Sequence, residues 1–191
     1  MDGAVGLTYA DLVRTLICDP PPADFAELLE RRRRLGLDRR DEVWDGVYRV
    51  NPTPAMAHSI TCRQLALILD PLARSAGLVL SMEFNLGEQG DFRIPDLGLH
   101  RDPELGVWHA TAALVVEVLS PEDEAPLKLP FYAARGVEEV VIVDPARREV
   151  EWLALADGDY LHVTRSRLLD VGADGLAALI EWPAQVSEAP G

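Results

Sequence analysis

Residues suited to chemistry are concentrated in one stretch of the chain, from Ile94 to Lys128. The centre of this stretch, residues 112–121, is an apolar run rich in Val and Leu, which is typical of a buried strand. Glu117 lies inside the run, and an ionised carboxylate on a buried strand is costly unless an opposite charge compensates it. We therefore expect a cation beside Glu117, and the candidates are a metal ion, Lys128 or both.

Lys128 is the single lysine among the 18 basic residues of the chain, and all the others are arginine. Its position can be a matter of chance. It can also mean that this position requires an amine, because lysine carries a compact ammonium whose pKa can shift, whereas arginine carries a planar and permanently charged group. Composition alone leaves both explanations open.

Asp96 supplies a second carboxylate, near the end of the strand predicted before the one that carries Glu117. Carboxylates that converge from neighbouring strands can bind a hard cation such as Mg²⁺ or Mn²⁺. Such an ion can activate water and stabilise charge on a phosphate, and a nearby lysine adds preorganised positive charge. Asp96, Glu117 and Lys128 are thus a minimal set for phosphodiester hydrolysis, although a structural ion pair between Glu117 and Lys128 also explains these residues.

The apolar patterning predicts the elements that would position this set. Helices are predicted within residues 6–40, over residues 57–76 and in a segment that ends near Gly136; strands are predicted over residues 42–50 (a hairpin), 78–86, 92–99, 112–121, 137–143, 149–156 and 160–164. The strand–helix–strand unit over residues 112–144 is long enough for a right-handed parallel crossover, and the other strands are expected to pair locally and antiparallel. We expect an α/β (or α+β) fold, with a mixed sheet flanked by helices.

Length and composition narrow the class of protein. The 191 residues suit one domain with a sizeable core, and the formal net charge of −14 argues against a simple nucleic-acid binder and against an anionic membrane surface as a partner. The sequence shows neither a long apolar run nor a secretory signal, so we expect a cytoplasmic protein without a membrane partner. Cys18 and Cys62 have no CxxC spacing, and we expect two buried thiols rather than a zinc site or a disulfide.

A series of motifs runs along the chain from residue 42 to residue 164. It comprises Glu42-Val43-Trp44-Asp45-Gly46-Val47-Tyr48 with Pro52, Pro54 and His58, then Pro95-Asp96, Val115-Val116-Glu117-Val118-Leu119-Ser120-Pro121, Lys128 with Phe131-Tyr132-Ala133-Ala134-Arg135-Gly136-Val137, and Ile142-Val143-Asp144-Pro145. In this order the motifs resemble the Uma-type restriction endonuclease family, which belongs to the PD-(D/E)XK nuclease superfamily. Residues 1 to about 40 fall outside the resemblance.

The resemblance implies a restriction-endonuclease-like core, a divalent metal ion (Mg²⁺ or Mn²⁺) and hydrolysis of DNA. Asp96 and Glu117 would be the metal ligands, and Lys128 would be the active-site lysine. The superfamily signature places its lysine two residues after the acidic residue, where this chain has Leu119. In this family the lysine is instead supplied from the following helix, which suits Lys128.

Three further residues match positions of the family and are candidate accessory groups. Glu42 and Asp123 could complete the metal shell, or could be solvated turn carboxylates. His58, at the predicted start of a helix, could act as a general base, or could serve only in capping or packing.

We expect residues 1–41 to form a helical extension packed on the core, residues 42–186 to form the restriction-endonuclease-like domain, and residues 187–191 to form a flexible tail. The leading function is a metal-dependent DNA endonuclease. Paired cuts on two strands imply two active sites, so a homodimer is expected. The alternative is a catalytically inactive relative that acts as an acidic interaction or regulatory module.

The net charge is the main difficulty for the leading function. A protein of charge −14 needs a local basic strip or a metal-bridged contact to hold DNA. The candidates for the strip are Arg31–Arg34, Arg39, Arg40 and Arg63. RNA or a smaller phosphodiester would suit the same chemistry.

Overall fold

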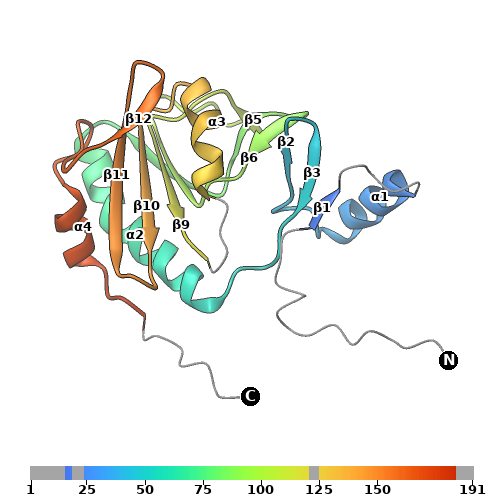
Figure 1. Cartoon of the computed structure of the whole chain (residues 1–191), viewed down its shortest axis with the longest axis horizontal. Coiled ribbons are helices and arrows are strands. Elements are labelled where there is room, and N and C mark those ends of the chain that lie inside the picture. The colour runs from blue at the N-terminus through green and yellow to red at the C-terminus, as the bar shows by residue number, and fades with distance from the viewer. Residues whose placement is uncertain (1–15, 19–23, 121–124, 184–191) are drawn as a thin grey trace. The chain divides into compact units, whose positions relative to one another are not determined.

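The computed structural model describes residues 16–18, 24–120 and 125–183, and the chain divides into two compact units (Figure 1). The first unit contains the described residues up to Thr53 together with Gln89–Ile94, and the second contains Pro54–Glu88 together with the described residues from Pro95 onward. Over the described parts of the chain, no helix has the length and apolar character needed to span a membrane.

The described part of the first unit consists of one helix and four strands. The helix is α1 (Phe25–Leu35), and the strands pair antiparallel in the order β1 (Leu16–Cys18), β3 (Val47–Val50), β2 (Glu42–Trp44) and β6 (Asp91–Arg93). The predicted hairpin of β2 and β3 is confirmed. Asp45 and Gly46 take φ values of 49° and 82°, and a two-residue turn of this kind needs positive φ at both positions. The helical prediction for residues 6–40 is wrong at residues 16–18, which pair with β3 as the strand β1, and its part before residue 16 lies outside the described residues.

The second unit is built on a six-stranded mixed sheet. Its strands lie in the order β12 (Asp159–His162), β11 (Glu149–Ala156), β10 (Glu139–Asp144), β9 (Leu114–Val118), β7 (Leu97–His100) and β4 (Val79–Met82). β9 and β10 are parallel, which confirms the predicted crossover, and the other pairs of this sheet are antiparallel. The expected antiparallel pairing is wrong for β5 (Asn85–Glu88) and β8 (Trp108–His109), which run parallel to each other.

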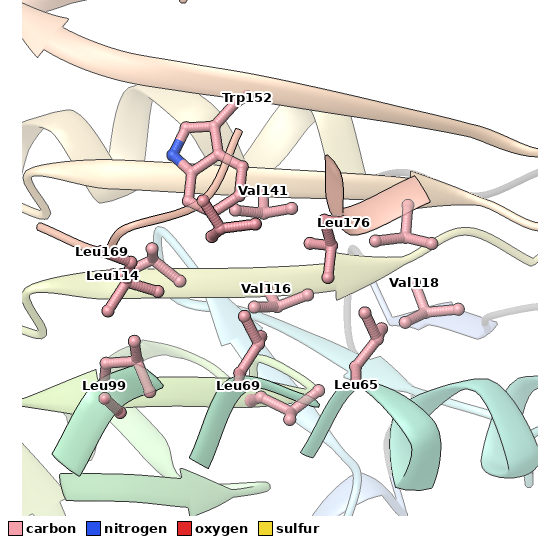
Figure 2. Packing of buried hydrophobic residues seen from close by; sticks show 14 of the residues in the cluster. Leu65, Leu69, Leu99, Leu114, Val116, Val118, Val141, Trp152, Leu169 and Leu176 are labelled. Atoms are coloured by element: carbon pink, nitrogen blue, oxygen red, sulfur yellow. The ribbon is translucent and has the colours of Figure 1, made fainter. Parts of the chain in front are cut away.

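Both faces of this sheet are covered, and every residue of β9 is buried. Leu114, Val116 and Val118 point to the face packed by α2 (Met56–Ser75) and α4 (Ala173–Leu179), as Figure 2 shows with Leu65, Leu69 and Leu176. Val115 belongs to the cluster on the other face, where α3 (Leu129–Ala134) supplies Phe131 and Tyr132. Because side chains alternate along a strand, Glu117 points to the α3 face.

The fold class is confirmed, with three local differences. The strand predicted over residues 78–86 is divided into β4 and β5, with Glu83 at a φ of 44° between them. The strand predicted over residues 92–99 is divided into β6 and β7, since Pro95 has no N–H for a strand ladder. Helix α4 was not predicted; it has seven residues and contains Gly175, which weakens a helical pattern.

The predicted division of the chain into an extension (residues 1–41), a domain (residues 42–186) and a tail (residues 187–191) stays a prediction.

Candidate active site

Glu117 is held by two donors from the segment that follows β9. Nζ of Lys128 lies 3.1 Å from Oε1 of Glu117, and the hydroxyl of Tyr132 donates to the same oxygen. Lys128 ends the 3₁₀ turn η2 (Ala125–Lys128), and Tyr132 lies four residues later in α3, so both reach the same side. The expected lysine partner is therefore present, and Tyr132 is a second partner that the sequence analysis did not assign to Glu117.

The pair is well shielded from solvent. The side chains of Glu117 and Lys128 are 7% and 12% exposed, and Tyr132 is fully buried. A buried charge pair is stable only when hydrogen bonds satisfy its remaining groups, and the Tyr132 hydroxyl contributes one such bond.

Asp96 directly precedes β7, the strand that lies beside β9 in the sheet. Leu97, the first residue of β7, pairs with Val116 of β9, which directly precedes Glu117. Oδ2 of Asp96 accepts a hydrogen bond of 2.8 Å from the backbone N–H of Val118. Asp96 and Glu117 therefore come from neighbouring segments of one sheet, and their convergence on a single ion stays a prediction.

His58 reaches Asp96 from the first turn of α2. Its Nε2 atom lies 2.9 Å from Oδ1 of Asp96, and its Nδ1 atom lies 3.3 Å from the hydroxyl of Ser120. Cys62 follows one turn later, and the ligand atoms of His58, Cys62 and Asp96 lie within 4.8 Å of one another. CxxC spacing does not indicate this group, because its members are a His and a Cys four residues apart and an Asp that is distant in the sequence.

Of the two candidate accessory carboxylates, Glu42 and Asp123, only Glu42 lies among the described residues. Glu42 is 2% exposed, so the interpretation as a solvated turn carboxylate is wrong for this residue. Within the first unit, its Oε2 atom accepts from the indole N–H of Trp44 at 2.8 Å and its Oε1 atom from the backbone N–H of Ile94 at 2.6 Å. Its accessory role at a metal stays a prediction. Asp123 lies outside the described residues.

The side chains around Asp96 suit two kinds of chemistry. The carboxylates of Asp96 and Glu117 are the oxygen ligands that Mg²⁺ and Mn²⁺ prefer, and Lys128 adds positive charge at the same strand. His58, whose ring nitrogens contact a carboxylate and a hydroxyl, is placed to accept or donate a proton.

Comparisons with known proteins agree with the fold. The family model Uma2, described as "Putative restriction endonuclease", matches residues 23–177, so the match includes α1 and extends beyond residues 42–164 in both directions. A crystal structure of "a putative nuclease belonging to DUF820 from Anabaena variabilis ATCC 29413" aligns with a TM-score of 0.61 at 12% identity, over 73% of this chain and 90% of that one. At this identity the likeness concerns the fold.

A cryo-electron microscopy structure of a DrdV–DNA complex aligns at 19% identity with a TM-score of 0.36, over 60% of this chain and 10% of that one. The comparison with curated proteins finds no match.

Proposed function

Because this chain belongs to the Uma2 family of restriction-endonuclease-like proteins, we propose that it is a metal-dependent endonuclease that hydrolyses phosphodiester bonds in DNA. We assign Asp96 and Glu117 as ligands of Mg²⁺ or Mn²⁺, and Lys128 as the catalytic lysine. The observation that supports this most strongly is the ion pair of Lys128 with Glu117, in which Nζ lies 3.1 Å from the carboxylate, on a strand whose neighbour β7 begins directly after Asp96. The proposal also takes the protein to be a cytoplasmic homodimer.

When bound, the ion would supply an activated water and a positive charge for the developing phosphate charge. The residues of the chain prepare this position. The Val118 N–H holds one oxygen of Asp96, and the Tyr132 hydroxyl holds one oxygen of Glu117, so both carboxylates are oriented before an ion arrives.

Lys128 would donate to a non-bridging oxygen of the scissile phosphate. Its ammonium is already held at the strand by Glu117, so little reorganisation is needed when the phosphate arrives. His58, at hydrogen-bonding distance from Asp96, would accept a proton from the attacking water or pass it to solvent.

One observation favours the alternative of a catalytically inactive relative that acts as an acidic interaction module. Glu117 and Lys128 are only 7% and 12% exposed, whereas a reacting phosphate must reach them. The formal charge of −14 also suits a protein partner better than DNA.

Cleavage of supercoiled plasmid in Mg²⁺ or Mn²⁺ tests the function. We expect cleavage by the parent chain, and its loss in Glu117→Gln and in the presence of a chelator. Glu139→Gln is the matched control, because Glu139 is also buried but accepts hydrogen bonds from Trp152, Ser166 and Arg167. Cleavage that persists in Glu117→Gln would contradict the assignment. A parent chain that never cleaves DNA would support the interaction module.

A further inference from the structure

We propose that His58, Cys62 and Asp96 form a binding site for a borderline transition metal ion of the Zn²⁺ class. This inference goes beyond the proposed nuclease function, and it does not require that the chain cleave DNA. It rests on three ligand atoms of different chemistry that converge within 4.8 Å.

The helix brings two of these ligands together. His58 and Cys62 are four residues apart on α2, so their side chains lie on one face, one above the other. Asp96 approaches from the segment before β7, and its Oδ1 atom lies 2.9 Å from Nε2 of His58. Ligands that share a zinc ion are roughly 3 to 4 Å apart, as follows from its bond lengths to N, O and S. The group therefore needs only small side-chain movements to close on an ion.

The chemistry of the ligands selects the ion. Thiolate and imidazole favour Zn²⁺ and similar borderline ions, whereas Mg²⁺ prefers oxygen ligands alone. One sulfur, one nitrogen and one carboxylate oxygen also leave a fourth tetrahedral position for water or a phosphate oxygen, as in catalytic zinc sites.

Neighbouring groups already orient two of the ligands. The hydroxyl of Ser120 lies 3.3 Å from Nδ1 of His58, on the side of the ring away from Nε2, and metal-bound histidines use this second nitrogen in the same way. The Val118 N–H holds Oδ2 of Asp96, while Oδ1 faces His58.

The three groups are shielded but not closed off from solvent. Cys62 is 5% exposed, and the side chains of His58 and Asp96 are 11% and 12% exposed. Attraction between an ion and its ligands is stronger in such surroundings than in bulk water, because screening is weaker. An ion that enters here would also engage Asp96, so Zn²⁺ is expected to compete with the use of Asp96 in cleavage.

Co²⁺ is a suitable probe, because a bound thiolate gives it a charge-transfer absorption in the near ultraviolet. The full chain, with thiols reduced and no DNA present, is titrated with Co²⁺ and then with Zn²⁺. We expect one Co²⁺ per chain with this absorption, and its loss when Zn²⁺ displaces Co²⁺. In Cys62→Ser the absorption disappears, and in His58→Gln the affinity falls. Ser120→Ala, which removes only the group behind His58, should lower Zn²⁺ affinity about 10- to 100-fold.

Two controls make the result specific. Cys18→Ser removes the other buried thiol and should keep the absorption. Glu117→Gln should also keep the Co²⁺ absorption, but it should lose DNA cleavage. Failure of the His58–Cys62–Asp96 site and failure of the proposed function are therefore distinguishable. Circular dichroism and thermal unfolding without metal show that each variant is folded. The proposal is overturned if the parent binds neither ion, if the absorption persists in Cys62→Ser, or if it is lost in Cys18→Ser.

Discussion

The ammonium of Lys128 lies 3.1 Å from the carboxylate of Glu117, although eleven residues separate them in the chain. The acid comes from β9 and the lysine from the turn before α3. Leu119, two residues after Glu117, directly follows β9 and packs with the residue cluster on the α3 face. The same face of the sheet therefore receives its cation from a different element.

This relationship predicts the effect of moving the lysine. Lys128→Ala should reduce DNA cleavage by about 100-fold or more, since one preorganised charge is lost. Adding Leu119→Lys should restore part of the activity, because residue 119 directly follows β9 and packs on the same face as Glu117. Initial cleavage rates measure both effects. If Lys128→Ala cleaves at the parent rate, Lys128 is not the catalytic lysine.

The hydroxyl of the buried Tyr132 should contribute more to stability than the hydroxyl of the half-buried Tyr160. Its hydroxyl donates to the carboxylate of Glu117, whereas the hydroxyl of Tyr160 donates to the carbonyl of Val137 at 2.7 Å. Tyr132→Phe should therefore lower the free energy of unfolding by about 1.5 to 3 kcal/mol, and Tyr160→Phe by about 1 kcal/mol. Urea unfolding of the two variants gives the comparison, and an equal or reversed order would show that the Glu117 contact adds nothing.

Glu139 should act in stability alone. Its carboxylate accepts from the indole of Trp152 at 2.8 Å, from the hydroxyl of Ser166 at 2.6 Å and from the backbone N–H of Arg167 at 2.6 Å. Glu139→Ala leaves these donors without their acceptor, at a cost of about 3 kcal/mol or more in the free energy of unfolding. Calorimetric titration of the folded variant with Mn²⁺ should give the affinity of the parent. If the Mn²⁺ affinity of Glu139→Ala is lower than that of the parent, Glu139 belongs to a metal site instead.

His100 should make stability depend on pH. Burial lowers the pKa of His100 below its usual 6.5, and the nearby His109 lowers it further. Below pH 6.5 the unfolded chain takes up a proton that the folded chain resists, so the free energy of unfolding falls as pH decreases from this value towards the folded pKa, and it is fully retained above pH 6.5. Urea unfolding between about pH 7.5 and 5.5 should show a smaller loss in His100→Asn than in the parent.

The control for this pH dependence is His162→Asn, since the His162 side chain is 73% exposed. As the pH is lowered, His162→Asn should lose as much free energy of unfolding as the parent does. A parent slope that is unchanged in His100→Asn would assign the pH dependence to other groups.

The arginines of α1 should contribute to DNA affinity unequally. Arg32 pairs with Asp41 at 2.7 Å, and the exposed Arg33 pairs with Glu30 at 2.8 Å. Arg31 and Arg34 are also exposed. If Arg31 and Arg34 both contact phosphates, the double alanine variant should flatten the slope of log K against log salt by about 1.8. Fluorescence anisotropy with a labelled duplex measures this slope. Arg147→Ala, at an exposed turn of the second unit, should leave it unchanged.

Much of the architecture was predictable because it depends on local pattern. The apolar run around Glu117, the Asp45-Gly46 turn and the long amphipathic helix over residues 56–75 each have a short-range signature that the structure confirms. The pairing of Glu117 with Lys128 was also predictable, because a buried carboxylate requires a cation and the chain has one lysine.

Other features were decided only by the tertiary structure. The approach of Asp96 to His58 and Cys62 depends on how β7 lies relative to α2, which no spacing within the chain encodes. The sequence left Glu42 as either a metal ligand or a solvated turn carboxylate, and the structure shows it buried, with the indole of Trp44 and the N–H of Ile94 as its donors. A sequence fixes periodicity and local turns, because these depend on neighbouring residues. Which side chains meet across elements depends on strand register and helix packing, which only the assembled fold determines.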